Sequence, residues 1–253
     1  MIYLTVCTRP MPDHHYDNQK LAALYDLDSP WSEDREFYLN LAGSSPMRIL
    51  DLGCGTGLLC DAYAAKGHEV TGVDPAPAML DVAKKKPNGA TIEWVLSSAQ
   101  EFSSGSKYDL IIMTGHAFQV LLEDADIAAA LHNMKRHLAS GGRIVFESRN
   151  PSIDWQKSWD YEMELTVDGA AIIEKRRFIS MIDGRMVFDL HYQFPDESLV
   201  SRSELRFLTR VEIGRHLEAA GLHPVAVLGD WNGAPFDEAT SDEMIFVLEG
   251  QIE

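Results

Sequence analysis

The stretch ILDLGCGTGLL, from Ile49 to Leu59, decides the fold. Two apolar residues lead into Asp51, and Gly53, Gly55 and Gly57 follow it within a span of five positions. Glycine weakens both helices and strands, so a cluster directly behind a strand-like run needs a reason. A strand that turns sharply into a helix leaves free backbone N–H groups at the helix start, and glycines let a ligand approach them closely.

The segments around this stretch alternate between strands and helices. Short apolar runs predict seven strands, at 47–52, 68–74, 90–96, 108–115, 143–148, 223–230 and 243–249. Helical patterns lie between them, the longest over 124–142, where Gly141 and Gly142 are expected to end the helix. This alternation predicts βαβ units and a mostly parallel, doubly wound, seven-stranded α/β sheet of the Rossmann-like kind.

The alternation is interrupted once, after the fifth strand. Four strand-like stretches follow one another between about residues 160 and 208, with Asp-Gly turns at 168–169 and 183–184 that are typical of hairpins. We therefore expect an antiparallel β insertion, or cap. The predicted organisation is a helical lid at 1–45, a ligand-binding domain formed by 46–152 and 205–253, and the cap at 153–204.

Composition limits the possible partners. The chain has 253 residues and a formal net charge of -17, which disfavours a nucleic-acid substrate. The three cysteines have no metal-ligand spacing and favour a reducing compartment. The start, MIYLTVCTRP, is not a convincing signal peptide, and no apolar run has the length of a membrane span. These features predict a cytoplasmic protein without a metal site or membrane contact, as a monomer or homodimer.

Two carboxylates indicate what the glycines bind. Asp51 stands two residues before Gly53, where it would repel a pyrophosphate but attract an ammonium group. Asp74 ends the next strand, where an acid accepts hydrogen bonds from a ribose diol. The spacing G-x-G-x-G also differs from the G-x-G-x-x-G of dinucleotide sites. A ligand with an ammonium group, a ribose and no phosphate is S-adenosylmethionine, whereas a nicotinamide-dependent oxidoreductase is the weaker alternative.

At this point the sequence resembles the class I S-adenosylmethionine-dependent methyltransferases, and more narrowly a bacterial group that acts on small molecules. LDLGCGTG is similar to their first motif and VTGVDPAPAML to their second, and the resemblance covers roughly residues 40–150 and 205–250. It implies that the insertion roofs the acceptor site. The implied cofactor-binding residues are Asp51, Gly53, Cys54, Gly55, Asp74, Pro75, Met79, Ala99, Gln100, Thr114, Gly115 and Phe118, with Tyr25 and Trp31 from the lid.

The candidates for chemistry follow the ends of the later strands. His116 lies just beyond the fourth strand and is the candidate catalytic base, or else it only hydrogen-bonds a loop or the carboxylate of the methyl donor. Glu147 lies near the end of the fifth strand and Arg149 directly follows that strand, and both are candidates for the acceptor site. The alternative for Glu147 is a structural ion pair with Arg149 or another arginine. Trp231 after the sixth strand and His191 in the cap are further acceptor-binding candidates, with a turn and a solvated sheet face as the respective alternatives.

These residues predict an S-adenosylmethionine-dependent methyltransferase that acts on an O or N atom of a small metabolite. Methyl transfer from a sulfonium needs mainly proximity and orientation, and a base only where the acceptor must lose a proton. The glycines indicate binding alone, so a non-catalytic subunit that binds S-adenosylmethionine or S-adenosylhomocysteine is the alternative from another class. A closed acceptor pocket beside His116 favours the enzyme, and a filled one favours the binding subunit.

Overall fold

A seven-stranded sheet forms the centre of the molecule, as the sequence predicts. The computed structural model describes residues 14–167 and 169–250. The strand order is β10-β11-β5-β4-β1-β2-β3, and only β11 runs antiparallel to its neighbours. The strands are β1 (Arg48–Leu52), β2 (Glu69–Asp74), β3 (Glu93–Leu96), β4 (Tyr108–Met113), β5 (Leu138–Arg149), β10 (Pro224–Leu228) and β11 (Glu243–Glu249).

The order of the strands sets where a ligand can bind. The chain starts at β1 in the middle of the sheet, moves outward to β2 and β3, and then crosses back to β4 on the other side. The carboxyl ends of β1 and β4 therefore diverge at a switch point, where open α/β sheets bind their ligands. Because β11 is antiparallel to β5, its first residue, Glu243, pairs with Arg149 at the same edge.

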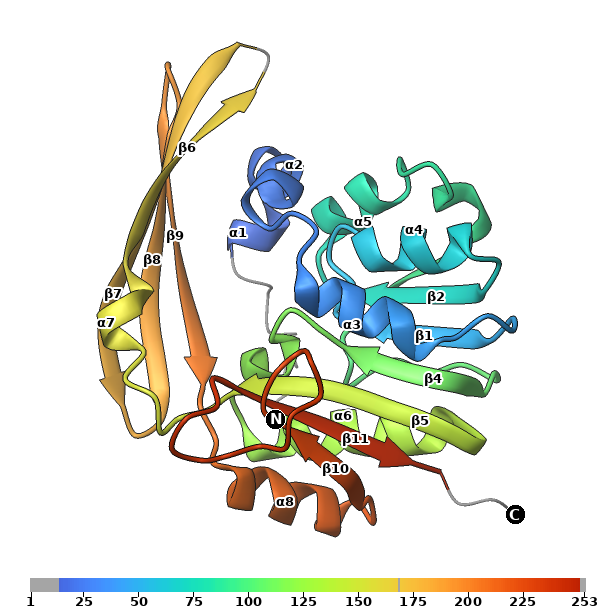
Figure 1. Ribbon diagram of the computed structural model, residues 1–253. Helices are drawn as coiled ribbons and strands as arrows, with labels where there is room; N and C mark the ends of the chain where they lie inside the picture. Colours follow the sequence, from blue (N-terminus) through green and yellow to red (C-terminus); the bar gives the residue numbers. More distant parts are fainter. Residues whose placement is uncertain (1–13, 168, 251–253) are drawn as a thin grey trace, which may run out of the picture.

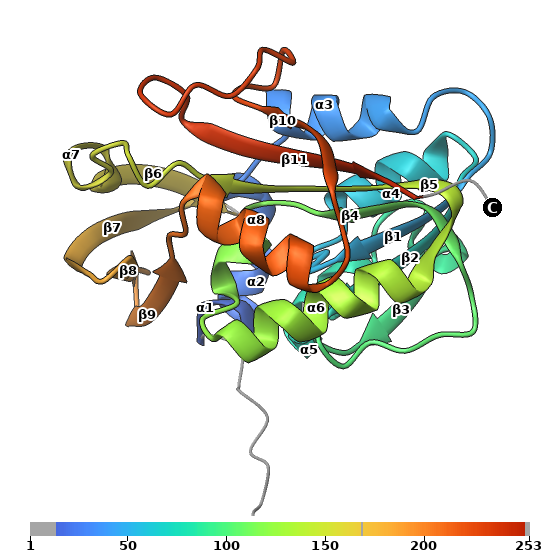
Figure 2. The ribbon, with the colours of Figure 1, turned by 90° about the horizontal axis from the view of Figure 1, so that it is seen from below.

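Helices cover both faces of this sheet (Figure 2). One face packs against α3 (Glu33–Leu41) and α4 (Leu58–Ala65), and the other against α6 (Asp124–His137) and α8 (Arg210–Ala219). Continuous apolar strands such as β4 fit this double coverage, because both of their faces are buried. None of the helices in the described ranges is both long and apolar enough to cross a membrane.

The predicted helix over 124–142 is wrong in its last five residues. The helix α6 ends at His137, and β5 begins at the next residue. The glycines at 141 and 142 lie inside this longer strand, which pairs with β4 from Leu138 onward. The imidazole of His137 ends the helix, since its Nδ1 bonds the carbonyl of Asn133 and its Nε2 accepts the N–H of Ser104.

The insertion after β5 forms a separate four-stranded antiparallel sheet, which confirms the predicted cap. It follows the short helix α7 (Gln156–Trp159), has the order β6-β7-β8-β9 and stands to one side of the central sheet (Figure 1). Its strands are β6 (Tyr161–Val167), β7 (Ala170–Ile182), β8 (Arg185–Gln193) and β9 (Ser198–Arg206). Asp183 and Gly184 both have positive φ in the turn from β7 to β8, as a tight hairpin requires.

The N-terminal helices divide into two parts with different contacts. The helices α1 (His14–Asp17) and α2 (Gln19–Asp28) lie between the cap and α5 (Pro77–Ala83), and we call α1 and α2 the lid (Figure 1). Leu21 and Leu24 of α2 are buried against the inner face of the cap. The third helix, α3, packs on the central sheet instead, so it belongs to the core. Residues 1–13, including Cys7 and the start of the predicted lid, lie outside the described residues.

Candidate active site

The glycine-rich loop between β1 and α4 is fastened to the neighbouring strand. The backbone N–H groups of Gly53 and Cys54 both donate to the carbonyl of Val73, at 2.8 and 3.0 Å. Gly57 is the N-cap of α4, with φ +68°. A Cβ at this position would lie 2.4 Å from Cη2 of Trp94, so both the backbone and the packing require glycine there. These hydrogen bonds and the packing against Trp94 therefore hold the loop in a tight turn.

Two buried carboxylates flank the loop. Asp51 is buried in β1, its Oδ2 lies 3.3 Å from the thiol of Cys60, and its Oδ1 has no hydrogen-bond partner among the described residues. Asp74 accepts the N–H of Gly55 at one oxygen and that of Ala76 at the other, both at 2.8 Å. Burial raises the pKa of Asp51 to about 7 and that of Asp74 to about 6.

The lid covers this loop. Tyr25 of α2 lies over Gly55, since a Cβ there would stand 4.0 Å from Cε1 of the tyrosine. Asp26, the next lid residue, accepts a hydrogen bond from the Thr56 hydroxyl and pairs with Lys86 beyond α5. The lid is thus tied to both sides of the predicted donor site.

The remaining predicted cofactor residues fall in several environments. Pro75 is exposed directly after Asp74, whereas Met79 is buried beneath the lid. Ala99 and Gln100 follow β3, and both of their carbonyls accept from the side-chain amide of Asn133. This asparagine of α6 therefore fixes the loop that is expected to face the adenine.

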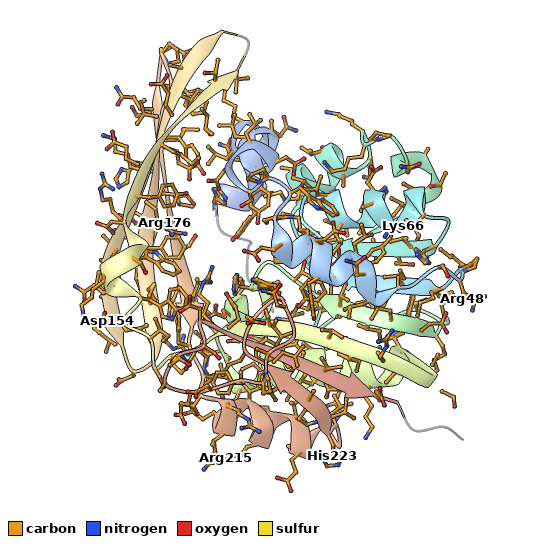
Figure 3. The ribbon with its side chains drawn as sticks, viewed as in Figure 1. Arg48, Lys66, Asp154, Arg176, Arg215 and His223 are labelled. Atoms are coloured by element: carbon orange, nitrogen blue, oxygen red, sulfur yellow. The ribbon has the colours of Figure 1, made fainter. Side chains whose placement is uncertain are left out.

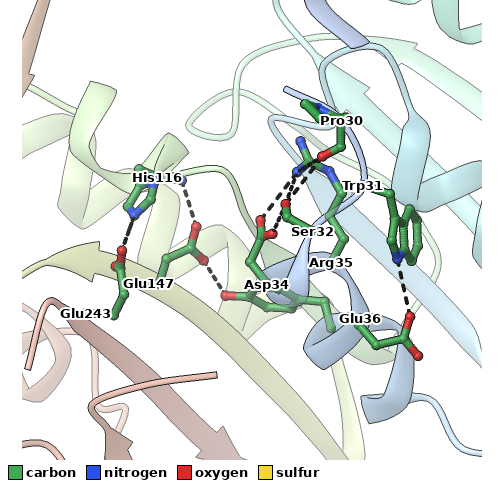
Figure 4. Close-up of polar contacts among 10 residues, drawn as sticks. Pro30, Trp31, Ser32, Asp34, Arg35, Glu36, His116, Glu147 and Glu243 are labelled. Atoms are coloured by element: carbon green, nitrogen blue, oxygen red, sulfur yellow. Dashed lines mark hydrogen bonds and ion pairs between the residues drawn. The ribbon is translucent and has the colours of Figure 1, made fainter. Parts of the chain in front are cut away.

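The residues after β4 separate into two groups. Thr114 is half-buried and Gly115 exposed at the strand end, next to His116. Phe118 points into the core instead, where its ring stacks on Phe146 at 4.6 Å. Trp31 is also away from the glycine loop contacts: it is 41% exposed, and its indole N–H donates to Glu36 (Figure 4).

A cavity of about 700 Å³ opens at the carboxyl edge of the sheet, beside His116. Its wall comes from the sheet edge, from the β10–β11 loop and from the base of the cap. Of the predicted acceptor residues it includes Arg149 and Trp231. The other lining residues are Glu33, His116, Trp155, Ser158, Trp159, Arg176, Gly229, Asp230, Ala234, Pro235, Asp237, Thr240, Ser241, Asp242 and Glu243.

His116 is held from two sides. Its backbone N–H donates to Oε1 of Glu147 at 2.7 Å, and its Nε2 lies 2.9 and 3.0 Å from the two carboxyl oxygens of Glu243 (Figure 4). Glu147 also accepts the Tyr38 hydroxyl from α3. With both oxygens engaged, Glu147 is a buried support for the loop and does not line the cavity. It forms no ion pair with Arg149 among the described residues.

Burial removes charge from the pair of His116 and Glu243. It lowers the pKa of His116 to about 3, with the positive charge of Arg149 as a second cause. It raises the pKa of Glu243 to about 7. The short contact resembles an ion pair, but both shifts disfavour the charged forms, so we assign a neutral hydrogen bond at low pH. Above about pH 7 the carboxyl loses this proton, and the pair becomes a base.

The structure does not bring His191 to this site. It pairs with Lys175 in the cap and lines a second cavity of about 310 Å³, whereas the neighbouring Tyr192 is buried on the inner face. Sequence reasoning missed Glu243, Arg176 and the tryptophans of α7. The first had a usable signal, because an antiparallel last strand places its first residue at the carboxyl edge. The others depend on how the cap folds over the sheet.

The comparisons with known proteins point to methyltransferases. A model described as a methyltransferase domain matches residues 49–142, which contain the glycine loop, Asp74 and His116. This match makes the chain a methyltransferase, and solved structures of similar fold include S-adenosylmethionine-dependent methyltransferases. The cypemycin N-terminal methyltransferase of a Streptomyces species is 26% identical over 214 residues, with 80% of this chain and 83% of that protein covered.

Solved structures of similar fold cover nearly the whole methyltransferase, including its cap. The CcbJ methyltransferase of Streptomyces caelestis has a TM-score of 0.75 and 20% identity, with 93% of this chain and 98% of that chain covered. An amino pentose methyltransferase of Micromonospora echinaspora has a TM-score of 0.68 and 24% identity, with 90% and 94% covered. The chain also matches ubiquinone biosynthesis O-methyltransferases, but it spans less than half the length of several of them.

The residues around the glycine loop fit S-adenosylmethionine, the ligand bound in the structure of the amino pentose methyltransferase. Asp51 has a buried carboxyl oxygen without a partner, which suits an ammonium group. Each oxygen of Asp74 accepts only one N–H, which leaves acceptor capacity for a diol. Within the described part of the chain, no group of three or more His, Cys, Asp or Glu side chains could hold a metal ion.

Proposed function

We propose that this methyltransferase transfers a methyl group to the amine nitrogen of a small metabolite, with the pair of Glu243 and His116 as its base. The observation that carries the proposal is the contact of this pair at the wall of the open cavity. S-adenosylmethionine supplies a methyl group that is already activated by the sulfonium charge. We place it between the glycine loop, Asp74 and Tyr25 of the lid.

The residues of the chain prepare the acceptor for an in-line displacement. An amine is protonated at neutral pH and has no free electron pair to attack a methyl group. The ionised carboxyl of Glu243 takes this proton, and the Nε2–H of His116 stabilises the carboxylate in the ionised pair. Glu147 fixes the backbone of His116 and thereby the position of its imidazole. The lid and the tryptophans of the cavity exclude water and orient the acceptor.

The acidic lining of the cavity supports an amine. Glu33, Asp230, Asp237 and Asp242 join Glu243 around the opening and favour a cationic acceptor. The names of the similar proteins point the same way, since they include an N-terminal methyltransferase and an amino pentose methyltransferase. The net charge of -17 disfavours a nucleic acid as the acceptor.

An O-methyltransferase is the second candidate. The same base would serve a hydroxyl, which must lose its proton to become a nucleophile. The matches to ubiquinone biosynthesis O-methyltransferases favour this candidate; one of them covers 73% of that protein, and others cover less than half.

Incubation of the enzyme with S-adenosylmethionine and matched acceptors tests the proposal. We would offer amino sugars alongside the same sugars with a hydroxyl in place of the amine, and detect the added methyl group by mass spectrometry. We expect methylation of the amines only. Glu243→Gln should lower the rate by about 100- to 10,000-fold. Glu249→Gln, at the other end of β11, is the matched control and should retain activity. Full activity of Glu243→Gln would contradict the role of the base, and methylation of the hydroxyl sugars would favour O-transfer.

A further inference from the structure

Two arginines and a tryptophan form the side of the cavity that belongs to the cap. Trp159, at the end of α7, is buried, and the guanidinium groups of both arginines stack on its ring. The centre of the Arg176 guanidinium lies 4.4 Å from the ring centroid, and that of Arg149 lies 5.1 Å from it. Arg149 ends β5 of the central sheet, whereas Arg176 belongs to β7 of the cap (Figure 3). All three side chains line the cavity.

Both arginines keep most of their hydrogen-bonding capacity. Nη1 of Arg149 donates to the side-chain oxygen of Gln119 at 3.0 Å, and Nε of Arg176 donates to the carbonyl of Trp159 at 2.8 Å. A guanidinium group has five N–H donors, so several on each group remain for a ligand. Over residues 14–167 and 169–250, neither arginine has a carboxylate within ion-pair distance.

Holding two like charges side by side costs free energy. Burial lowers the pKa of both arginines, to about 10 for Arg149. The positive charge of Arg176 also lowers the pKa of Arg149. The acids that offset the charge act from a distance: Glu243 and Glu147 on Arg149, and Asp28 and Glu174 on Arg176. The flat tryptophan ring orients both guanidinium planes.

We propose that Arg149 and Arg176 bind an anionic oxygen group, a phosphate or a carboxylate, on the methyl acceptor. Guanidinium groups pair with such oxyanions through two parallel hydrogen bonds, and this geometry specifies them better than a point charge does. The stacking on Trp159 leaves the edges of the guanidinium groups free for this contact. Glu243 lies at the sheet edge of the same cavity and receives the amine, so the acceptor carries both a basic nitrogen and an acidic group.

The inference that the anionic group belongs to the methyl acceptor rests on the proposed function, but anion binding itself can be measured without catalysis. We would titrate the enzyme with inorganic phosphate and with acetate at constant ionic strength, in the presence of S-adenosylhomocysteine, and follow tryptophan fluorescence. The variants are Arg149→Gln and Arg176→Gln. Arg177→Gln is the matched control, because Arg177 is the next residue of β7 and lies on the opposite face of the cap, beside His191.

We expect a saturable response of the wild-type protein and of Arg177→Gln to at least one anion, and a loss of affinity of about 10-fold or more in the other two variants. A response to phosphate identifies a phosphoryl group, and a response to acetate identifies a carboxylate. No saturable response in the wild type, or equal affinity in all four proteins, would overturn the inference. If Arg149→Gln does not fold, Arg149→Lys keeps the charge without the paired donors and should still weaken binding.

The same samples separate this inference from the proposed function. Binding of S-adenosylhomocysteine and methylation of amines, with indifference to both anions, leaves the function in place and removes the anion site. Anion binding that depends on both arginines, without methyl transfer to any amine, leaves the anion site and removes the proposed amine chemistry.

Discussion

Replacement of Gly57 by alanine tests the structural role of the glycine loop. The residue has φ +68°, a conformation that costs roughly 1–2 kcal/mol for a residue with a Cβ. The added Cβ would also lie 2.4 Å from Cη2 and 2.9 Å from Cζ3 of Trp94, and 3.0 Å from Cβ of Ala83. Overpacking of this kind costs about 1–3 kcal/mol. We therefore expect the free energy of unfolding to fall by about 2–5 kcal/mol.

Gly67→Ala provides the matched control. Gly67 has φ +87°, after the C-cap of α4, and a Cβ there would meet no atom within 4 Å. This variant should therefore show the backbone cost alone, about 1–2 kcal/mol. Urea unfolding followed by circular dichroism gives both free energies, provided that the denaturant slopes agree. The difference between the two variants isolates the contact with Trp94.

A double-mutant cycle identifies the contact directly. Trp94→Phe removes the outer ring atoms that the new Cβ would meet, so it should recover part of the loss in Gly57→Ala. A coupling of about 1 kcal/mol or more between the two sites is expected for residues in direct contact. If Gly57→Ala loses no more stability than Gly67→Ala, or if the two substitutions simply add, the argument from close packing is wrong.

Three further outcomes follow from single contacts. The pKa of Glu243 is about 7, so kcat/KM should rise about 10-fold between pH 6 and pH 8, and Glu243→Gln should abolish this rise. Initial rates measured across this pH range test the prediction. A rise that is retained in the variant speaks against Glu243 as the base. Burial raises the pKa of Glu174 from 4.5 to about 7, so the folded state holds its proton more tightly and stability decreases as pH rises through this window. Glu174→Gln should reduce that decrease in urea unfolding at pH 5 and pH 8, and an identical decrease in both proteins counts against this assignment. Asp26→Ala removes the contacts of the lid with Thr56 and Lys86. It should speed the release of S-adenosylhomocysteine about 5-fold in stopped-flow measurements. An unchanged release rate would show that these contacts do not hold the lid.

The centre of the fold is predictable because its signals are local. An apolar strand, an acid, three glycines and a helix follow one another within residues 49–65, and the next strand ends at Asp74 only a few positions later. Neighbouring βα units determine their own geometry, so the sequence pattern predicts a mostly parallel, doubly wound sheet. The position of the cap between β5 and α8 follows from the interrupted alternation in the same way.

The acceptor site depends on contacts between distant segments. Glu243 meets His116 across 127 positions in the chain, and Arg149 meets Arg176 only through the folded cap. Alternation along β8 separates two faces but does not say which one is covered. The apolar face, with Phe188 and Tyr192, packs on the lid, which leaves His191 on the outer face. The predicted helix extended beyond α6 because β5 already begins at Leu138, which pairs with Tyr108 of β4, and no local pattern indicates this pairing.

The central claim is that the glycine loop and Asp74 bind S-adenosylmethionine. Calorimetric titration of the purified protein with S-adenosylhomocysteine tests it most directly, with NADH as a parallel ligand. Asp74→Ala removes the carboxylate, and Asp81→Ala is the matched control on the exposed side of α5. We expect micromolar binding of S-adenosylhomocysteine by the wild type and by Asp81→Ala, greatly weakened binding by Asp74→Ala, and no binding of NADH. Undiminished binding by Asp74→Ala, or binding of NADH in place of S-adenosylhomocysteine, would contradict the account.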